Sequence, residues 1–332
     1  MDLQQRINAF VKLGEKIVEN DYFKDHFQKI LRSNAWFTKE NIIHRLTYVA
    51  SQLKKNKIEE WLRLYDFSVI KRKKTVLIVL AGNIPLVGFH DFLSSLIVGH
   101  KLVVKMSSKD NVILTLIINE LINISAYFLE NIEIVNEIRK NNFDAVIATG
   151  NDQSAKYFNY YFKKSKRIIR KNRTSVAILS GKESSSELEA LTLDIFLYFG
   201  LGCRNVSKIY VPYNYDLNKL FKVFYKYKDI INHKKYANNY NYNKTIFLMG
   251  NNKLLDNGFI LLKEDNSINS PLAMLYYEFY KRKEDVKHLI NRDRHNIQCI
   301  VSKKDVYFGL SQIPKLSDYS DGVDVINFLI NI

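Results

Sequence analysis

The stretch Thr75–Met106, TVLIVLAGNIPLVGFHDFLSSLIVGHKLVVKM, indicates the fold class of this chain of 332 residues most clearly. Its first part, TVLIVLA, is a short continuous apolar run, which is typical of a strand buried on both faces. A loop then leads from Gly82 into an apolar helix that ends near Gly99. KLVVKM, at Lys101–Met106, is a second buried strand. Strand, helix and strand in this order predict a parallel, doubly wound sheet.

The same alternation continues along the chain and predicts an α/β protein with two Rossmann-like units. FDAVIATG (Phe143–Gly150) is predicted as another strand, which ends in a glycine, and a second series of strands and helices follows. In that series YANNYNYNK (Tyr236–Lys244) is predicted as a polar loop and KTIFLMG (Lys244–Gly250) as a strand. The predicted domains are a helical N-terminal region (1–70), a first Rossmann-like domain (71–179), a second α/β domain (180–304) and a C-terminal tail packing back on the first domain (305–332).

The charge balance leaves three interpretations open. Fifty Lys and Arg against 34 Asp and Glu give a formal charge of +16. Such a charge suits nucleic acid, small polyanionic ligands such as phosphorylated cofactors, or simple compositional drift. The lysines are spread over the whole chain and no arginine-rich tract occurs, so drift is favoured first and nucleic acid last.

Cysteine usage and hydropathy favour a cytoplasmic protein. Only two cysteines are present, Cys203 and Cys299, which excludes a disulfide framework and suits a reducing compartment. The amino-terminal sequence has charges throughout, unlike a signal peptide, and no charge-free apolar run reaches the length of a membrane span. We therefore expect no membrane span and no nucleic-acid partner.

Cys203 is the first candidate for chemistry. It lies in FGLGCRNVSKIYV, between a predicted helix and a predicted strand, with Gly200 and Gly202 beside it. Nearby glycines allow a ligand to approach the backbone closely, and the neighbouring Arg204 could lower the pKa of the thiol. From these residues alone, a nucleophile and a buried structural cysteine are equally supported. Cys299 lies in an apolar strand, NIQCIV, and is predicted to be structural.

Asn83 is the second candidate. It directly follows the first buried strand, in AGNIP, and Pro85 restricts the chain two residues later. An asparagine at the carboxyl end of a strand can direct its side-chain N–H at a developing oxyanion. An Asx turn that ends the strand explains the same residue equally well.

The ends of the next strands offer candidate cofactor residues. A lysine and two hydroxyls, with no carboxylate before Asp110, end the second strand, and such a set tolerates a ribose 2′-phosphate. A threonine, a glycine and an asparagine end the strand FDAVIATG and open a helix, which is a natural phosphate seat. These residues are Lys105, Ser107, Ser108, Thr149, Gly150 and Asn151. Neither G-x-G-x-x-G nor a P-loop occurs, and no histidine or cysteine spacing indicates a metal.

From Lys74 to Val301 the order and spacing of these sites resemble the aldehyde dehydrogenase superfamily. Within it, the chain is most similar to the long-chain fatty acyl-CoA reductases of bacterial luminescence systems and their short relatives in Bacteroidetes. The resemblance implies that Asn83 builds the oxyanion hole, Lys105 binds the adenosine ribose, Thr149–Asn151 replaces the family's T-G-S turn, and Cys203 is the catalytic cysteine. It also implies a first domain that binds the cofactor and a second that carries the cysteine.

Two departures from the superfamily pattern bear on the activity. The segment that carries a general-base Glu in hydrolytic members corresponds to IIRKNR (Ile168–Arg173), which contains none. A second Glu, which helps to hold the nicotinamide ribose, is replaced near Ser267. Hydrolysis of an acyl-enzyme needs a base that activates water, whereas reduction does not. The loss favours a reductase, and it also suits an inactive homologue.

The resemblance therefore implies NADPH-dependent reduction of a fatty acyl-CoA thioester to the aldehyde through an acyl-cysteine intermediate, with NADH as the alternative cofactor. The alternatives are reduction of another acyl donor, such as an acyl-carrier-protein thioester or an acyl phosphate, and a noncatalytic nucleotide-binding scaffold. A homo-oligomer or a protein that donates the acyl group are the further partners considered. No metal is expected.

Overall fold

The computed structural model describes residues 1–19, 21–139 and 142–332. It divides into two compact units, one formed by Met1–Asn172 with Lys315–Ile332 and the other by Arg173–Pro314. The units separate before residue 174, whereas the domain boundary predicted from the sequence lies between 179 and 180. The difference arises because the strand at 174–178 pairs within the second sheet.

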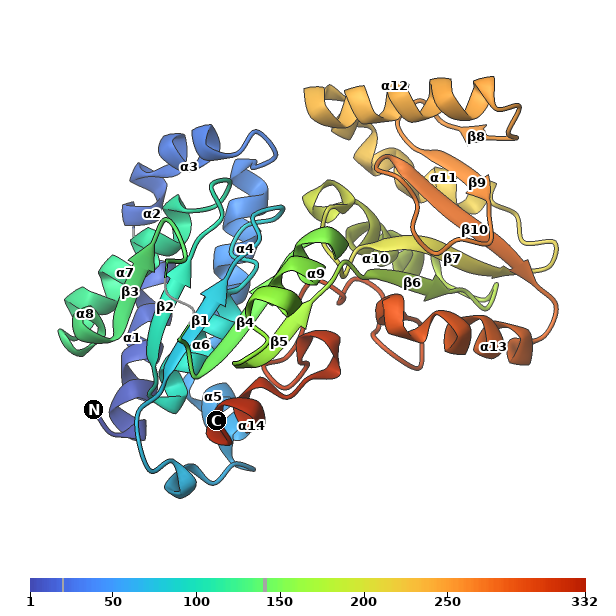
Figure 1. The fold of residues 1–332 in the computed structure, drawn as a ribbon. Helices are drawn as coiled ribbons and strands as arrows, with labels where there is room; N and C mark the ends of the chain where they lie inside the picture. The colour runs from blue at the N-terminus through green and yellow to red at the C-terminus, as the bar shows by residue number, and fades with distance from the viewer. Residues whose placement is uncertain (20, 140–141) are drawn as a thin grey trace. The chain divides into compact units, whose positions relative to one another are not determined.

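The first unit contains a five-stranded sheet in the order β3-β2-β1-β4-β5, with every pair parallel (Figure 1). Its strands are β1 Thr75–Val79, β2 Lys101–Lys105, β3 Ile132–Val135, β4 Ala145–Thr149 and β5 Lys166–Arg170. Its helices are α1 Leu3–Glu19, α2 Asp21–Asp25, α3 Phe27–Ser33, α4 Lys39–Gln52, α5 Lys55–Leu62, α6 Phe89–Val98, α7 Val112–Ile124, α8 Tyr127–Asn131, α9 Asp152–Tyr161 and α14 Val325–Ile330.

The two faces of this sheet are covered unequally. The large core cluster joins one face to the N-terminal helices, α6, α7 and α14. The smaller cluster on the opposite face joins Leu77, Val103 and Val146 to Phe158 and Phe162, the latter two from α9 and the turn after it. The helical N-terminal region thus forms part of the first unit's main core.

The second unit contains a six-stranded sheet in the order β11-β6-β7-β10-β9-β8, parallel except for β8. Its strands are β6 Thr174–Ile178, β7 Val206–Pro212, β8 Leu255–Asp256, β9 Leu261–Glu264, β10 Met274–Tyr280 and β11 Ile297–Val301. Its α-helices are α10 Ser185–Phe196, α11 Asn218–Phe224, α12 Lys234–Met249 and α13 Lys283–Asp293. One face packs against α10 and α11, and the other against α13.

Two expectations within the second unit are wrong. The predicted loop at 236–244 and the predicted strand at 244–250 together form one helix, α12. Tyr236, Tyr240 and Asn243 are its buried residues. They lie at i, i+4 and i+7, so this face is held by tertiary packing although asparagine is a weak helix former. The α/β class and the parallel pairing in both sheets are confirmed.

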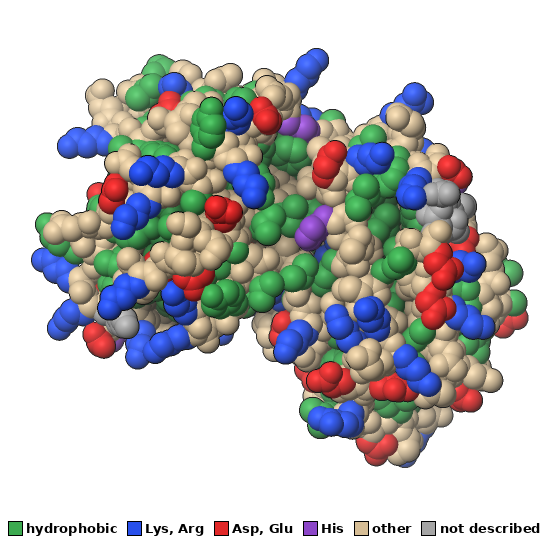
Figure 2. Space-filling model, turned by 180° about the vertical axis from the view of Figure 1, so that it is seen from behind, with side chains coloured by type: hydrophobic (Ala, Val, Ile, Leu, Met, Phe, Trp, Pro, Cys, Tyr) green, Lys and Arg blue, Asp and Glu red, His purple; other side chains and the backbone are tan. Residues whose placement is uncertain are grey.

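The charge distribution on the surface and the hydropathy of the helices relate to the partners considered above, nucleic acid and a membrane. On the face shown in Figure 2, Lys and Arg side chains are scattered among acidic and apolar ones. In the ranges that the structure describes, no helix is long and apolar enough to cross a bilayer.

Candidate active site

The candidate residues of the first unit lie along the carboxyl edge of its sheet. Strand β1 lies between β2 and β4, and both pairs are parallel, so the segments that leave these three strands are neighbours. The strand order runs outward from β1 in both directions, through β2 on one side and β4 on the other. In doubly wound sheets, ligands bind at the carboxyl edge where the strand order reverses in this way. The residues brought there are Asn83, Lys105, Ser107, Ser108, Thr149, Gly150 and Asn151.

The loop that carries Asn83, here called the Asn83 loop (Gly82–Leu86), is fixed from behind. Asn83 is exposed. Asn34 donates from Nδ2 to the carbonyl oxygen of Gly82 at 2.9 Å, and Arg45 donates from Nη2 to that of Leu86 at 2.8 Å. Leu86 has a φ of +54°, a conformation that costs a residue with a Cβ about 1–2 kcal/mol. Buried hydrogen bonds hold the loop in a shape that its sequence alone does not favour.

Asp110 is the third anchor of the Asn83 loop. Its Oδ2 accepts a hydrogen bond from the backbone N–H of Leu86 at 2.7 Å, and only 5% of the residue is exposed. Its Oδ1 is buried and, within the described part of the chain, has no hydrogen-bond partner. Burial raises the pKa of Asp110 to about 7, against the opposing effects of the Leu86 N–H and the Arg45 charge. This carboxyl group therefore changes its charge near neutral pH.

The turn after β2 packs directly on the Asn83 loop. A Cβ atom on Gly82 would lie 2.6 Å from Oγ of Ser107, so only glycine allows this approach. Ser107 is half-buried and its Oγ accepts the N–H of Lys109 at 3.2 Å. Lys105 donates from Nζ to the carbonyl oxygen of Met106 at 3.1 Å.

The polar groups of this turn fit a phosphorylated ribose. Ser108 is exposed, and Lys105 and Ser107 are half-buried. The acidic residue of the turn, Asp110, is directed into the protein and is engaged by Leu86. A basic and hydroxyl-bearing strand end without an accessible carboxylate suits a 2′-phosphate better than a bare 2′-hydroxyl.

Another predicted cofactor segment, Thr149–Asn151, also leads into the start of helix α9. The N-cap of α9 is Asn151, whose Oδ1 accepts the N–H of Ser154 at 2.8 Å. A Cβ on Gly150 would lie 2.8 Å from Cβ of Ser154, so glycine is required for the helix to begin here. The side chain of Asn151 thus caps the helix, and the binding of a cofactor at this strand end stays a prediction.

Cys203 belongs to the second unit. It is exposed and lies in the turn between α10 and β7, at the amino-terminal edge of the second sheet. The preceding segment is left-handed at Tyr198 (φ +54°), Phe199 (φ +59°) and Gly200 (φ +77°). Non-glycine residues rarely adopt this conformation, and such strain often accompanies functional sites. The buried structural cysteine that the sequence left open does not describe Cys203.

Two buried side chains hold the turn that carries Cys203, here called the cysteine turn (Leu201–Asn205). Asn205 accepts the N–H of Gly202 at its Oδ1, 2.8 Å away. Ser175, on β6, donates from Oγ to the carbonyl oxygen of Cys203 at 3.0 Å. The same Oγ accepts the backbone N–H of Cys299 at 3.2 Å. The cysteine turn is therefore tied to β6 and, through Ser175, to β11.

Cys299 is confirmed as a buried residue, with 8% exposure. Its Sγ lies 3.1 Å from Oγ of Ser175. Burial raises the pKa of the Cys299 thiol, with smaller opposing effects from Arg204 and Ser175. A buried thiol with a raised pKa is a poor nucleophile, so the two cysteines differ in reactivity.

The stretch without the general-base Glu has a structural role. It includes the end of β5, where Arg170 forms a buried bidentate ion pair with Asp91 of α6. Ser267, at the position of the second missing Glu, lies in the loop before β10 and donates its N–H to Asp265 at 2.8 Å. Neither segment supplies an accessible carboxylate at the predicted position.

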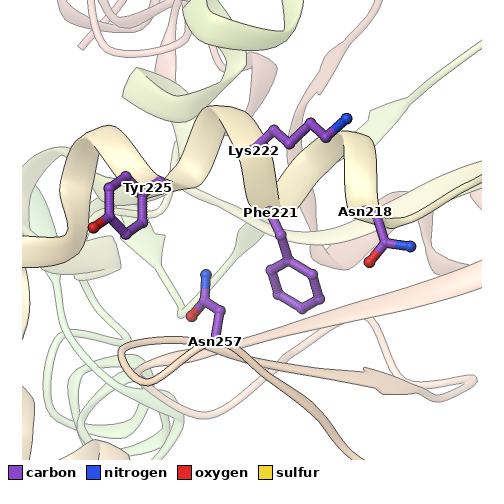
Figure 3. Close-up of a pocket in the computed structure, with 5 residues that line it drawn as sticks. All are labelled: Asn218, Phe221, Lys222, Tyr225 and Asn257. Carbon is purple, nitrogen blue, oxygen red and sulfur yellow. The ribbon is translucent and has the colours of Figure 1, made fainter.

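A separate shallow cavity of about 630 Å³ lies beside α11 (Figure 3). It is lined by Asn218, Phe221, Lys222, Tyr225 and Asn257. The sequence-predicted site residues do not line it.

The residues that hold the two loops were missed by the sequence analysis. Asp110 and Asn205 each lie two positions from a predicted site residue, which is the only signal that could have drawn attention to them. Ser175, Arg45 and Asn34 are distant in sequence, and pairing between elements is needed to find them.

Comparison with known structures shows an aldehyde dehydrogenase-like fold. Aldehyde dehydrogenase 21 from Physcomitrella patens, in complex with succinate, aligns over 100% of this chain and 84% of its own, with 15% identity and a TM-score of 0.68. A mutant of aldehyde dehydrogenase C from Pseudomonas syringae, with NAD⁺ and octanal, gives 11% identity, 91% and 72% coverage and a TM-score of 0.66. Glyceraldehyde-3-phosphate dehydrogenase from Methanocaldococcus jannaschii, in complex with NADP, aligns over 91% of this chain and 76% of its own, with 13% identity and a TM-score of 0.66.

The sequence comparisons are more specific. No curated protein matches the chain. The family model of the acyl-CoA reductases (LuxC) matches residues 8–308, which includes the candidate sites of both units. That span covers most of the chain, and the family is one of aldehyde-related oxidoreductases. The chain therefore belongs to the acyl-CoA reductase (LuxC) family.

Proposed function

We propose that this protein reduces a fatty acyl-CoA thioester to the corresponding aldehyde with NADPH, and that Cys203 carries the acyl group. The observation that supports the proposal most directly is an exposed thiol on a turn fixed by Asn205 and Ser175. The family match over 8–308 supports the acyl-CoA substrate.

The covalent step begins with the thiolate of Cys203. It attacks the thioester carbonyl, the carbon–sulfur bond to CoA breaks, and CoA leaves as a thiolate that takes up a proton. NADPH, when bound, supplies a hydride to the carbonyl carbon of the acyl-enzyme. The resulting alkoxide of the thiohemiacetal collapses as the bond to the sulfur of Cys203 breaks, which releases the aldehyde and regenerates the Cys203 thiolate. The net reaction consumes acyl-CoA, NADPH and one proton, and yields aldehyde, CoA and NADP⁺.

The oxyanion that forms at the carbonyl in both addition steps needs hydrogen-bond donors. The side-chain N–H of Asn83 fits this role because its loop is rigidly held and the residue is exposed. The strand end at Lys105, Ser107 and Ser108 would hold the adenosine 2′-phosphate of the cofactor. Thr149 and Gly150, at the same edge of the sheet, would lie against the phosphate groups of the cofactor.

The missing general-base Glu supports reduction over hydrolysis. Arg170 occupies the segment concerned and is buried in its pair with Asp91. Without a base to activate water, an acyl-cysteine survives until reduction. This favours the reductase over an aldehyde-oxidising enzyme.

The test is acyl transfer followed at Cys203. Incubation with radiolabelled palmitoyl-CoA should label the wild-type protein and leave Cys203→Ala unlabelled, and NADPH absorbance should fall only with the wild type. We expect the rate of reduction to drop at least about 10³-fold in Cys203→Ala. Cys299→Ala is the matched control and should retain labelling.

Each failure has a distinct meaning. Label that persists in Cys203→Ala would contradict the assignment of the nucleophile. Binding of NADPH without labelling or oxidation, for acyl chains from eight to eighteen carbons offered on CoA, on acyl carrier protein or as acyl phosphates, would favour the scaffold. Activity with a donor other than CoA would replace the substrate and leave the role of Cys203 intact.

A further inference from the structure

A single buried amide joins the end of α10 to the cysteine turn. Asn205 is only 2% exposed. Its Oδ1 accepts the N–H of Gly202 at 2.8 Å, immediately before Cys203. Its Nδ2 faces the carbonyl oxygens at the end of the helix: Leu197 at 2.9 Å, Asp194 at 3.1 Å and Ile195 at 3.4 Å.

The carbonyl groups at the end of a helix form its negative pole. Roughly half an elementary negative charge resides there, and it disfavours a nearby anion. Three of these oxygens converge on Nδ2 of Asn205, whose two hydrogens can be shared among them. The positive end of the amide dipole therefore faces the helix pole, and its oxygen end accepts from the turn that carries Cys203.

The same amide also fixes the shape of the turn. The left-handed conformations of Tyr198 and Phe199 cost free energy, and the segment needs compensating contacts. The hydrogen bonds of Asn205 span this segment, with Leu197 before it and Gly202 after it. Ser175 holds the carbonyl of Cys203 from the opposite side.

We propose that Asn205 is a positioning residue that fixes the cysteine turn and lowers the free energy of the Cys203 thiolate by masking the carboxyl-terminal pole of α10. This inference rests on the proposed function, in which Cys203 reacts as a thiolate. Asn205 acts through the turn and the helix carbonyls and has no contact with substrate in this role.

The experiment follows the reactivity of the thiol alone. The rate of alkylation of Cys203 by iodoacetamide is measured from pH 5 to 10, with the Cys203 peptide quantified by mass spectrometry. In Asn205→Ala we expect the midpoint of the rate profile to rise by about half a pH unit, the size typical of a helix-pole effect. In Asn205→Asp the rise should be larger, because a carboxylate cannot donate to the carbonyls and adds negative charge.

A second buried amide in the same unit provides the control. Asn243 of α12 is 7% exposed and donates from Nδ2 to the carbonyl of Leu272 at 2.8 Å. Asn243→Ala should also reduce stability but leave the Cys203 midpoint at its wild-type value. An unchanged midpoint in both Asn205 variants would overturn the proposal. So would an equal shift in Asn243→Ala, because that result would indicate general loosening.

The measurement is independent of the reductase reaction. It requires neither acyl-CoA nor NADPH, so a protein that reduces no thioester can still show the Asn205 effect. In that outcome the proposed function fails and the control of the thiol by Asn205 stands. If the enzyme is active but the midpoint does not move, the proposed function stands and this inference fails.

Discussion

The Asn83 loop and the cysteine turn are built on the same plan but with different chemistry. Each presents one exposed residue, Asn83 or Cys203, and each is held from behind by buried polar side chains. The cysteine turn is held by neutral groups, the amide of Asn205 and the hydroxyl of Ser175. The Asn83 loop depends on the carboxyl group of Asp110, whose pKa burial raises to about 7.

The difference separates the two loops in their response to pH. Amides and hydroxyls keep their charge across the physiological range, so the supports of the cysteine turn do not titrate there. Asp110 changes from neutral to charged near neutrality, within a buried site where Arg45 is the nearby cation. The Asn83 loop therefore has a support that titrates near neutral pH, whereas the supports of the cysteine turn do not.

The largest expected effect is on the stability of the first unit as a function of pH. The pKa of Asp110 is about 7 when folded and near 4 when unfolded, so between these values the unfolded chain has lost a proton that the folded one keeps. Unfolding free energy then falls with rising pH by about 1.4 kcal/mol per unit, or roughly 4 kcal/mol in total. Asp110→Asn should remove this slope.

Native probes allow the slope to be assigned to one unit. Both tryptophans, Trp36 and Trp61, lie in the first unit, so urea unfolding followed by their fluorescence reports on it alone. Asp25→Asn, at an exposed carboxylate of the same unit, is the control and should keep the wild-type slope. A slope that is identical in wild type and Asp110→Asn would show that the carboxyl group does not titrate as described.

The sequence predicted the fold better than the supports of its sites. Continuous apolar runs such as Thr75–Val79 identify buried strands because both faces of a parallel sheet are covered. The edge strand Ile132–Val135 escaped this signal, because Glu133 and Ile134 are exposed and the run is short. Helix α12 was missed because its single buried face overrides the weak helix preference of its asparagines.

In the candidate site, too, the sequence indicated the exposed residues but not the buried residues that support them. The exposed position of Cys203 follows from a glycine-flanked turn before a strand, which sequence alone suggested but could not separate from a buried cysteine. The pairing of Ser175 with Cys203 spans 28 residues, and that of Asn34 with Gly82 spans 48. Such pairings depend on how elements pack, so no local pattern could reveal them. The capping role of Asn151 could not be read from sequence either, because a capping side chain and a ligand-binding one share the same sequence signal.

The second effect concerns the rate of reaction at the Asn83 loop. Asn83→Ala should lower kcat about 100-fold, since loss of one oxyanion donor commonly has this effect. Its KM for acyl-CoA should change much less, because the donor acts on charge that develops during the reaction. Stopped-flow measurement of NADPH oxidation with saturating acyl-CoA gives the rate.

The control for Asn83 sharpens the comparison of the two loops. Alkylation of Cys203 by iodoacetamide creates no oxyanion, so Asn83→Ala should alkylate at the wild-type rate. Asn83→Asp, similar in shape but without the N–H donor, should be as slow in reduction as the alanine variant. A kcat within twofold of wild type in both variants would exclude Asn83 as the oxyanion donor and favour the Asx-turn explanation.

The smallest effect is expected at the cysteine turn itself. Ser175→Ala removes the donor to the Cys203 carbonyl and leaves the buried N–H of Cys299 without its acceptor, at a cost of about 1–2 kcal/mol. Local opening of the second unit should become correspondingly more frequent, so that Cys299, buried in the native protein, reacts with a thiol reagent about tenfold faster.

Labelling of Cys299 under native conditions shows whether Ser175 specifically stabilises its surroundings or whether any lost hydroxyl in the second unit has the same effect. Thr245→Ala removes a hydroxyl from the exposed side of α12, where its Oγ1 donates to Asn241, and should leave the labelling rate unchanged. Tryptophan fluorescence of Ser175→Ala should still show the wild-type unfolding of the first unit, including its slope with pH. If that slope changed with Ser175, the two loops would share a support, and the contrast between a neutral and a titrating anchor would no longer hold.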